Sequence, residues 1–332
     1  MAKIIDSFMF FQELDLLEIR LTYLDPYVDK FVIVEACQTF TGKEKKFIFE
    51  QNKDRFKQFL PKIEYYKIED FHNDYESVVK HLSAFQEGSY KKVLSFLENF
   101  SHFPKNQIHW VLDSYHRECL HLILDQVASD NDIVLISDLD EIPSKEAFNQ
   151  ENIEKYLVSP VVFQQDEFRY FLNYYKDSDW LGSIAAKYSL IRNYSFNILR
   201  IDSKEIRSLV NKDSLKNAGF HFTSCGGIEM VKAKIESWGH QEFNNSLVLR
   251  NLEKNIRTGQ DIFMRDDGTN LKKVDLDDRS IFDERLSNIM SKYSELISGE
   301  SIVEKTPSLI EQVFQKIHIT LHKIQHKLQQ EK

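Results

Sequence analysis

The sequence predicts an α/β fold, because short apolar runs rich in β-branched residues alternate with segments of helical periodicity. The chain opens with strand, helix and strand patterns over residues 3–36, an order that predicts two parallel strands joined by a right-handed crossover. Farther along, the apolar run Ile133–Ile136 ends abruptly in carboxylates, as expected where a buried strand reaches the ligand-binding edge of an open sheet. The 332 residues, 42% of them hydrophobic, are enough for one large α/β domain or two smaller ones.

The first half of the chain contains the clearest predicted elements. Strands are expected where apolar and β-branched residues form short runs, at Lys3–Phe11, Lys30–Ala36, Ile63–Ile68 and Ile133–Ile136. Helices are expected over Glu13–Leu24, which Asp25 and Pro26 close, and over Gln107–Val127, where apolar residues recur at helical spacing. Residues 74–100 are polar and mixed, and we expect a helical or irregular excursion there.

The second half of the chain has shorter predicted elements and more turns. Alternating or β-branched stretches predict strands, paired glycines predict a turn, and an Asp- and Lys-rich stretch predicts a loop. These elements are strands over Val161–Leu172, Ser189–Arg192 and Gly219–Phe222, an aromatic stretch over Tyr170–Tyr175, a turn at Gly226 and Gly227, a helix over Ile228–Trp238 and a loop over 266–280.

Composition excludes several classes of protein. The net charge is −9 and the pI is about 5.7, whereas a nucleic-acid-binding domain would show a basic surface. Cys37, Cys119 and Cys225 are widely spaced and form no disulfide framework, which favours a reduced compartment. We find no leader sequence and no apolar stretch of about 18 residues, so we expect a cytoplasmic protein. With only 10 glycines, the chain has neither a GxGxxG nor a Walker-type phosphate loop.

The carboxylates that end the run at Ile136 are the strongest functional signal. Asp138, Asp140 and Glu141 are costly to leave unpaired at the end of a buried strand, and their natural partner is a hard divalent cation such as Mg²⁺ or Mn²⁺. Asp138 and Asp140 are two residues apart and would share one side of an extended strand, where a metal could bridge to a diphosphate. In a chain with 29% charged residues, Asp-x-Asp alone usually marks a solvated loop, and the strand context is what favours a metal site.

The C-terminal segment has a different pattern. After Pro307 the apolar residues recur at helical spacing, while lysines and His318, His322 and His326 occupy the other face. We therefore divide the chain into a domain over 1–295 and an amphipathic helical tail over 296–332. The tail is interpreted as a peripheral or self-associating helix, with contact to a membrane surface as the alternative. Metal binding by its histidines is a further alternative.

Five stretches, in the same order, resemble glycosyltransferase family 17, which includes the β-1,4-mannosyl-glycoprotein 4-β-N-acetylglucosaminyltransferases. They extend from about residue 4 to about residue 285. They are Asp6–Leu21, Val28–Ala36 with Thr39–Lys43, Asp132–Pro143 with His116 and Arg117 before it, Gly219–Glu229 with Lys234–Ser237 and His240–Asn244, and Gly259–Arg265.

The resemblance implies a GT-A-like α/β/α sandwich with a mostly parallel central sheet. It also implies a UDP-sugar donor, N-acetylglucosamine above all, a divalent cofactor (Mn²⁺ or Mg²⁺), inversion at the anomeric carbon and a glycan acceptor. The chain lacks the signal-anchor helix and stem of the animal enzymes. We therefore expect an enzyme in the cytoplasm, with the inner face of a membrane as the alternative location, that builds a surface polysaccharide or another glycan rather than an N-glycan.

The resemblance also assigns roles to residues. Asp140 would bind the metal directly, Asp138 would bind it through water or face the ribose, and Glu141 would be a ligand or face the sugar. His221 or His240 could complete the metal site, because GT-A metals often take a late histidine; a structural, hydrogen-bonded histidine is the alternative. Contacts with uracil, ribose or phosphate are expected from Asp6, Glu35 and Arg117, although Arg117 could equally form a surface ion pair.

Inversion needs a general base that removes the proton of the acceptor hydroxyl. Asp261, within Gly259–Arg265, resembles an acceptor-side aspartate of inverting galactosyltransferases, and a helix N-cap is its alternative role. Glu242 and the pair Asp166 and Glu167 are the reserves. Trp238 and the aromatic stretch could stack on a sugar ring, although core packing is the commoner role of aromatics.

Two other functions are compatible with the sequence. A nucleotidyltransferase or phosphohydrolase could use the same acidic strand end, but it would need a second acidic cluster for a second metal. A non-catalytic module could keep the fold and bind a nucleotide sugar or a carbohydrate without turnover.

Overall fold

The computed structural model describes residues 2–99, 104–200, 213–263 and 271–302. The predicted tail after Pro307 and its three histidines lie outside these residues, so its proposed contacts stay predictions. Residues just after the predicted domain boundary pack into the domain, because Leu296 is buried and Ser298 exchanges hydrogen bonds with Asn173. None of the described helices is both long and apolar enough to cross a bilayer.

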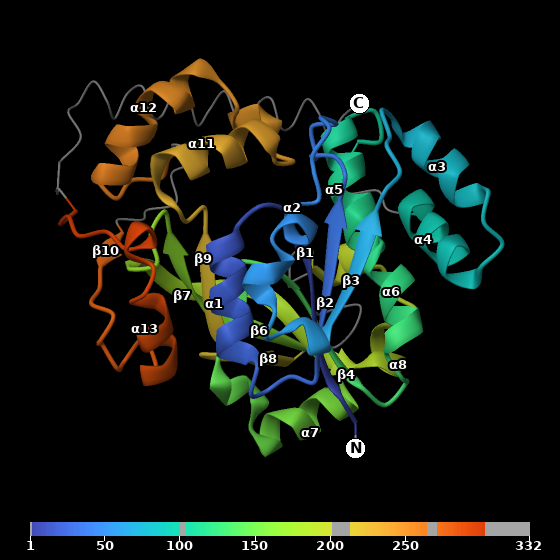
Figure 1. The fold of residues 1–332 in the computed structure, drawn as a ribbon, viewed down its shortest axis with the longest axis horizontal. Helices are drawn as coiled ribbons and strands as arrows, with labels where there is room; N and C mark the ends of the chain where they lie inside the picture. The colour runs from blue at the N-terminus through green and yellow to red at the C-terminus, as the bar shows by residue number, and fades with distance from the viewer. Residues whose placement is uncertain (1, 100–103, 201–212, 264–270, 303–332) are drawn as a thin grey trace.

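One sheet extends through the described part of the molecule (Figure 1), in the strand order β3-β2-β1-β4-β7-β6-β9-β5, with β10 beside β7 and β8 beside β6. Its strands are β1 (Ile4–Phe10), β2 (Lys30–Ala36), β3 (Ile63–Ile68), β4 (Ile133–Asp138), β5 (Glu141–Pro143), β6 (Val161–Arg169), β7 (Tyr174–Lys187), β8 (Asp213–Leu215), β9 (Gly219–Thr223) and β10 (Lys272–Lys273).

The sheet has a parallel half and a mixed half. β3, β2, β1 and β4 are parallel neighbours, with Ile5 opposite Lys30 on one side and Val134 on the other. Beyond them, β7 is antiparallel to both β4 and β6, while β9 is parallel to β6. The predicted α/β fold with a mostly parallel sheet is confirmed, and the carboxyl ends of four parallel strands lie together at one edge.

Helices cover both faces of this sheet. The described helices are α1 (Leu14–Leu24), α2 (Ile48–Gln51), α3 (Tyr75–Ser83), α4 (Gly88–Asn99), α5 (Ile108–Glu118), α6 (Leu120–Val127), α7 (Gln150–Val158), α8 (Tyr188–Ile191), α9 (Phe196–Arg200), α11 (Gly227–Ser237), α12 (Ser246–Arg257) and α13 (Glu284–Met290). In β2, Val32 and Val34 pack with α3 to α6, whereas Phe31 and Ile33 pack with α1 and α13. The alternation of side chains along each strand thus produces a three-layered sandwich.

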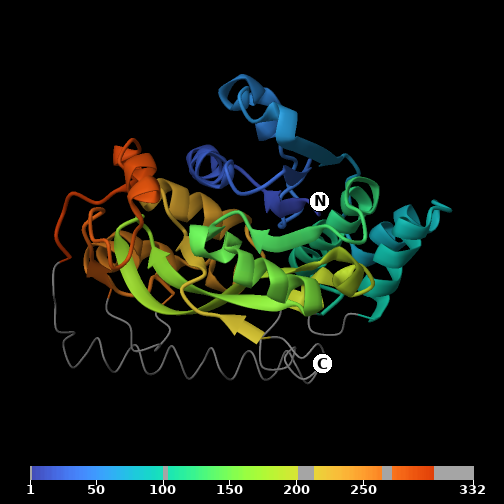
Figure 2. The ribbon, with the colours of Figure 1, turned by 90° about the horizontal axis from the view of Figure 1, so that it is seen from below.

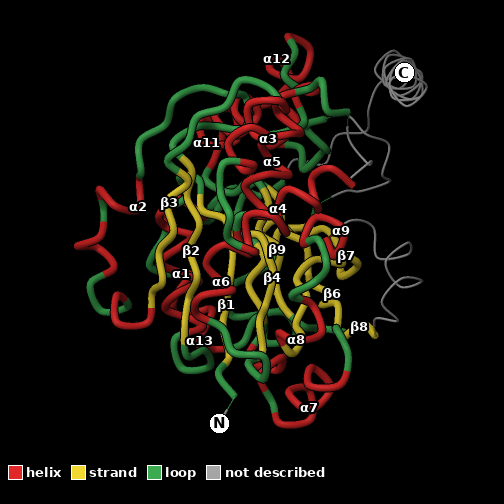
Figure 3. The backbone as a smooth tube through the Cα atoms, turned by 90° about the vertical axis from the view of Figure 1, so that its right-hand side faces the viewer, coloured by secondary structure: helices red, strands yellow, loops and turns green. Residues whose placement is uncertain are grey.

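The two ends of the sheet differ. Helices α11 and α12 lie beyond the end at which the parallel strands finish, and α7 lies toward the opposite end (Figures 1 and 3). In the view from below, α7 is the green helix in front of the strands (Figure 2), where Tyr156 packs with Ile133 and Leu135. The carboxyl end of the parallel half is therefore the end that can hold a ligand between the strands and α11.

Several predicted elements differ from the observed ones. The helix expected over Gln107–Val127 is divided into α5 and α6 at Cys119, and Ser189–Arg192 belongs to helix α8 rather than to a strand. There, backbone N–H groups of Tyr188 and Ser189 donate to carbonyls of the loop before β4, which overrides the local β propensity. The longest strand, β7, was not predicted, and its first residues were expected to be part of an aromatic stretch. Its bulged pairing with β6 and its polar residues hide the alternating pattern.

Candidate functional site

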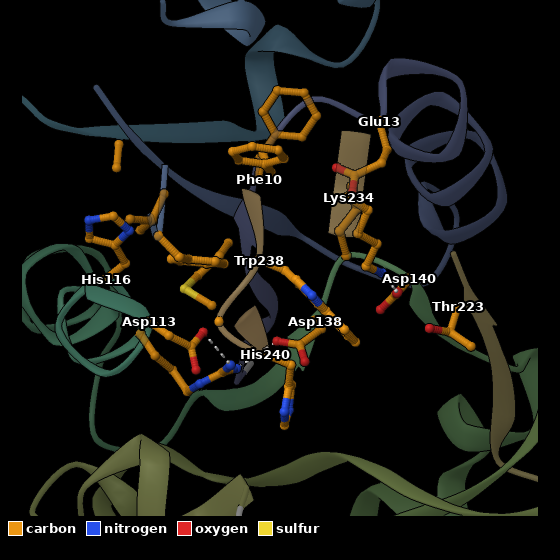
Figure 4. Close-up of a pocket in the computed structure, with 18 of the residues that line it drawn as sticks. Phe10, Glu13, Asp113, His116, Asp138, Asp140, Thr223, Lys234, Trp238 and His240 are labelled. Atoms are coloured by element: carbon orange, nitrogen blue, oxygen red, sulfur yellow. Dashed lines mark hydrogen bonds and ion pairs between the residues drawn. The ribbon is translucent and has the colours of Figure 1, made fainter. Parts of the chain in front are cut away.

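A cleft of about 320 Å³ lies at the carboxyl ends of β1, β2 and β4 and is also lined by residues from the end of α11 (Figure 4). Strand β1 contributes Met9 and Phe10, the turn after β4 contributes Asp138 to Asp140, and Lys234 and Trp238 come from α11 and the residue after it. Of these strands, β4 alone ends in a charged residue, Asp138, whereas β1 and β2 end in Phe10 and Ala36. Ligands of open α/β sheets bind at this type of position.

One end of the cleft is apolar. Phe11 and Phe40 stack there with their ring centroids 6.4 Å apart, and Val34 and Ile68 line the same space. His116 joins them from α5, is buried, and has an Nε2 atom with no hydrogen-bond partner. Burial lowers the pKa of His116 to about 3, so its imidazole is neutral and can donate or accept a hydrogen bond.

Asp138 ends β4 and is held by two arginines. Arg117 Nη1 donates to its Oδ1 at 2.6 Å, and Arg200 Nη2 donates to its Oδ2 at 2.7 Å. Burial alone would raise the pKa of Asp138, but the two guanidinium groups hold it well below its usual range. The carboxylate is therefore ionised, and both of its oxygens have a cationic donor.

Asp140 lies in the turn after β4, so it does not share one side of a strand with Asp138 as predicted. Lys234 Nζ lies 3.2 Å from its Oδ2, and His221 Nε2 lies 3.7 Å from its Oδ1. The His221 ring stacks on Trp180 at 4.1 Å between centroids, and its buried Nδ1 has no partner. Burial would lower the pKa of Lys234, but Asp140 raises it and keeps the ammonium charged.

Glu141 is fully buried and lies outside the cleft lining. Its carboxylate accepts hydrogen bonds from Arg200 at 2.5 Å, Trp180 Nε1 at 2.9 Å and the Asp138 backbone N–H at 3.1 Å. Glu141 thereby holds Arg200 and Trp180 against the turn.

A buried arginine fixes the shape of the same turn from below. Arg20, on α1, pairs with Asp6 through two hydrogen bonds of 2.8 and 2.6 Å, and its Nη1 donates to the carbonyls of Asp138, Leu139 and Glu141. Asp6 is fully buried and does not line the cleft. Asp6 thus positions the acidic turn through Arg20, and any direct contact of Asp6 with a nucleotide stays a prediction.

Glu35 lies below the surface of the cleft as well. Its carboxylate accepts from Lys45 at 2.5 Å, from the backbone N–H groups of Ile48 and Phe49, and from the Tyr65 hydroxyl at 2.8 Å. Lys45 does line the cleft, and Arg117 lines it too. Of the four predicted nucleotide contacts, Arg117 and Asp138 line the cleft, whereas Asp6 and Glu35 do not, and the roles of all four stay predictions.

The predicted general bases lie outside the cleft lining. Asp261 Oδ1 is 3.3 Å from Arg169 Nη1, and the same arginine pairs with Glu167 at 2.6 Å. Glu242 accepts from His240 Nδ1 at 2.8 Å. The fourth candidate, Asp166, is half-buried, and burial raises its pKa.

Two other carboxylates, Glu13 and Asp113, do line the cleft, and sequence reasoning missed both. Burial raises the pKa of Asp113, which is the change that suits a proton acceptor.

The four predicted metal ligands do not form a ready three-ligand group within the described parts of the chain. The oxygens of Asp138 are bound by arginines, and His240 pairs with Glu242. Asp140 and His221 fit a shared divalent ion, because ligand atoms about 2.0–2.2 Å from one ion can be 3.7 Å apart. No hydrogen bond fixes the tautomer of His221 through Nδ1, which has no partner. The ring can therefore carry its proton on Nδ1 and use Nε2 as a metal ligand.

Comparison with known families gives one match. Residues 1–95 match glycosyltransferase family 17. The match confirms the resemblance for the first two stretches, Asp6–Leu21 and Val28–Ala36 with Thr39–Lys43. It ends before the acidic turn of β4, so the family 17 match itself does not test the metal ligands or the donor. A search of curated proteins found no match.

Several solved structures are similar to this chain at low sequence identity. One is a 4-diphosphocytidyl-2C-methyl-D-erythritol synthase, with 13% identity, a TM-score of 0.32, and coverage of 65% of this chain and 90% of that one. Another, described as a glucose-1-phosphate thymidylyltransferase from Bacillus anthracis, has 9% identity, a TM-score of 0.30, and coverage of 66% and 88%. Mouse xyloside xylosyltransferase 1 has 12% identity, a TM-score of 0.24, and coverage of 50% and 52%. Scores of this size carry no conclusion about function.

Proposed function

We propose that the cleft binds a UDP-sugar and transfers the sugar, N-acetylglucosamine or a related hexose, to a glycan hydroxyl with inversion. The observation that carries this proposal is a single cleft whose lining combines an apolar, aromatic part with the charged residues Asp138 and Asp140. The match of residues 1–95 to glycosyltransferase family 17 supports glycosyl transfer.

The apolar end would hold the uracil base. Phe11 and Phe40 supply flat apolar walls, and the neutral imidazole of His116 offers a buried nitrogen that still lacks a partner. A buried polar atom without a partner costs free energy, and a base edge could satisfy it. The proposal thus explains why a polar atom is buried in an apolar wall.

The charged middle of the cleft would hold the diphosphate. Arg117 and Lys234 carry positive charge in the lining, and both are paired with aspartates of the turn. A divalent ion, Mn²⁺ or Mg²⁺, would be held by Asp140 and His221 and would stabilise the leaving diphosphate as a Lewis acid. Lys234 would then be released from Asp140 and could contact a phosphate oxygen.

The acceptor end would be lined by aromatic side chains. Trp110, Trp180 and Trp238 all line the cleft, and the first and third contact the His240 ring at 4.6 and 4.9 Å. Flat aromatic faces with a few polar groups are typical of binding sites for small ligands. We keep Asp261 as the proposed base from the family resemblance, with Asp113 as its competitor from the cleft lining.

The first test is thermal unfolding with UDP-, GDP- and CMP-sugars, each with Mn²⁺ and with chelator, followed by measurement of released nucleotide. A ligand that binds the native state alone raises the melting temperature. We expect stabilisation by UDP-sugars with Mn²⁺, together with UDP release. Stabilisation without UDP release would indicate a binding module instead, and pyrophosphate release from a nucleoside triphosphate would indicate a nucleotidyltransferase.

The base assignment is tested with Asp261→Asn and Asp113→Asn. We expect Asp261→Asn to lower transfer by about 10²–10⁴-fold, the usual contribution of a general base, with donor stabilisation unchanged. If Asp113→Asn is the variant that loses transfer while it still binds donor, the role belongs to Asp113.

A further inference from the structure

A second group of potential ligands lies outside the cleft. Asp70 and His72 are in the loop after β3, and His81 is on α3. Asp70 Oδ2 lies 2.5 Å from His72 Nε2, and Asp70 Oδ1 lies 3.5 Å from His81 Nε2. Among the residues that the structure describes, these three form the one group of His, Cys, Asp or Glu whose ligand atoms all lie within 4.8 Å of one another.

We propose that Asp70, His72 and His81 bind one transition-metal ion, with Zn²⁺ the favoured occupant, at a site separate from the cleft. Two imidazole nitrogens and one carboxylate oxygen are a ligand set that zinc takes commonly. Calcium and magnesium prefer oxygen ligands alone, so the histidines argue against them. None of the three residues lines the cleft.

The geometry suits a metal because both imidazoles direct the same nitrogen, Nε2, at the two oxygens of one carboxylate. His72 and Asp70 have side chains that are 5% and 17% exposed, and the His81 side chain is 28% exposed. The group is therefore buried enough to be ordered and open enough, on the His81 side, for an ion to enter. Without a metal, His72 hydrogen-bonds to the Asp70 carboxylate and His81 lies at ion-pair distance from it.

The neighbouring residues hold this group in place. Tyr115, on α5, donates its hydroxyl to Asp70 Oδ2 at 2.7 Å. The side chain of Gln38 pairs with the backbone of His72 through bonds of 2.9 and 2.8 Å. Such outer partners orient ligands and tune their basicity in metal sites.

The ion would link elements that are separate in the sequence. It would tie the loop after β3 to α3, while Tyr115 ties the same carboxylate to α5. Gln38 lines the cleft and Tyr115 precedes His116, which also lines it. A metal here would therefore stiffen one wall of the cleft from behind without touching a ligand in it.

The test is a metal titration of the full chain after treatment with chelator. Co²⁺ is followed by its visible absorption, and Zn²⁺ by its displacement of Co²⁺ and by the rise in melting temperature. We expect one tight metal site. Loss of a residue that only orients a ligand lowers metal affinity by roughly 10- to 100-fold, so His81→Gln, which removes a ligand, should lower it by at least as much. Asp70→Asn keeps the size of the side chain but removes the carboxylate ligand, and it should lower metal affinity by a similar factor. Tyr115→Phe should weaken binding less than His81→Gln.

Three controls separate this site from other histidines and carboxylates. His109→Gln changes a histidine of α5 outside the group, Asp140→Asn removes the proposed cleft ligand, and the joint change of His318, His322 and His326 to Asn removes the tail imidazoles. All three should keep the tight site. The proposal is overturned if His81→Gln, shown by circular dichroism to be folded, binds Co²⁺ as tightly as the parent, or if binding disappears in one of the controls. Because the readout is metal affinity, it is independent of glycosyl transfer.

Discussion

Two carboxylate groups follow parallel strands of the same sheet, and they are neutralised in different ways. After β4, Asp138 and Asp140 are paired with arginines and a lysine; after β3, Asp70 is paired with two histidines and a tyrosine. Arginine and lysine keep their positive charge at physiological pH, so they repel a metal ion that lies near them. A neutral imidazole is itself a ligand. The comparison teaches that an acidic motif alone does not identify the better metal site.

The largest expected effect concerns the buried arginine that fixes the first group. Arg20→Met leaves Asp6 charged and unpaired in the core, and three carbonyls of the turn lose their donor. Breaking a buried ion pair in this way costs about 3–5 kcal/mol in the free energy of unfolding. Urea unfolding measures the change. Arg55→Met is the matched control, because its partners Asp15 and Glu18 are exposed and it should cost at most about 1 kcal/mol. Equal small losses in the two variants would show that the turn does not depend on Arg20.

The next effect separates the two groups by their metals. Asp140→Asn should lower Mn²⁺-dependent transfer by about 100-fold or more, because a metal supplies several kcal/mol of stabilisation to the leaving diphosphate. The Co²⁺ absorption of the Asp70 group should not change. His81→Gln should give the reverse pattern. Asp130→Asn, at an exposed ion pair with Arg192, is the control and should alter neither measurement. Loss of both properties in one variant would mean that the two groups act as one site.

Much of the parallel half of the sheet could be predicted because its signal is local. The strands at Lys30–Ala36 and Ile63–Ile68 have the predicted bounds, since short buried strands are apolar runs with abrupt ends. The same signal located Asp138 and Asp140 in the cleft. Strand β7 was missed because its polar residues and bulges depend on pairing with β6.

Most of the residues that pair with the carboxylates of the cleft and with Asp70 could not be predicted, because they are distant from those carboxylates in the sequence. Arg20 reaches the carbonyl of Asp138 across 118 residues, and Trp180 reaches Glu141 across 39. The Asp70 group joins a loop to α3 and, across 45 residues, to Tyr115. No spacing rule of a single strand or helix links such residues. A short motif such as Asp-x-Asp is visible in a sequence, whereas its counter-charges come from the fold.

Glu118 is a buried carboxylate that is surrounded mainly by hydrogen-bond donors without a full charge, and these donors affect its pKa. Glu118 is buried on α5 and accepts from the Ser195 hydroxyl, from backbone N–H groups of Phe196 and Asn197, and from the Asn197 side chain, with His121 nearby. Burial would raise the pKa of Glu118, but His121 and these donors lower it.

This carboxylate should therefore contribute stability that is fully present above the unfolded pKa of about 4.3 and is lost as pH falls below it. Glu118→Gln should lower the free energy of unfolding at pH 7 by roughly 1–3 kcal/mol, the cost of an unsatisfied buried group. Its melting temperature at pH 7 should therefore be lower than that of the parent. Its melting temperature should fall less than that of the parent between about pH 5 and pH 3. Glu151→Gln, at an exposed pair with Lys155, serves as the control. Parallel pH profiles for Glu118→Gln and the parent would contradict this account of the Glu118 pKa.

The smallest effect tests whether the cations of the cleft compete with a metal. Lys234 Nζ lies 3.2 Å from Asp140, and the pair is partly exposed, so it is worth at most about 1 kcal/mol. Lys234→Met removes this competitor and should raise the affinity of the cleft for Mn²⁺ alone by up to about fivefold. Lys232→Met, at an exposed position of the same helix, should leave the affinity unchanged. Mn²⁺ binding is measured in the His81→Gln background, so that the Asp70 group does not contribute. A fall in affinity in Lys234→Met would mean that Lys234 orders Asp140 for the metal instead of competing with it. In that case, Lys234 would position Asp140 for the metal without repelling the ion. The acidic turn and the Asp70 group would then differ only in which neighbouring residues position the carboxylate.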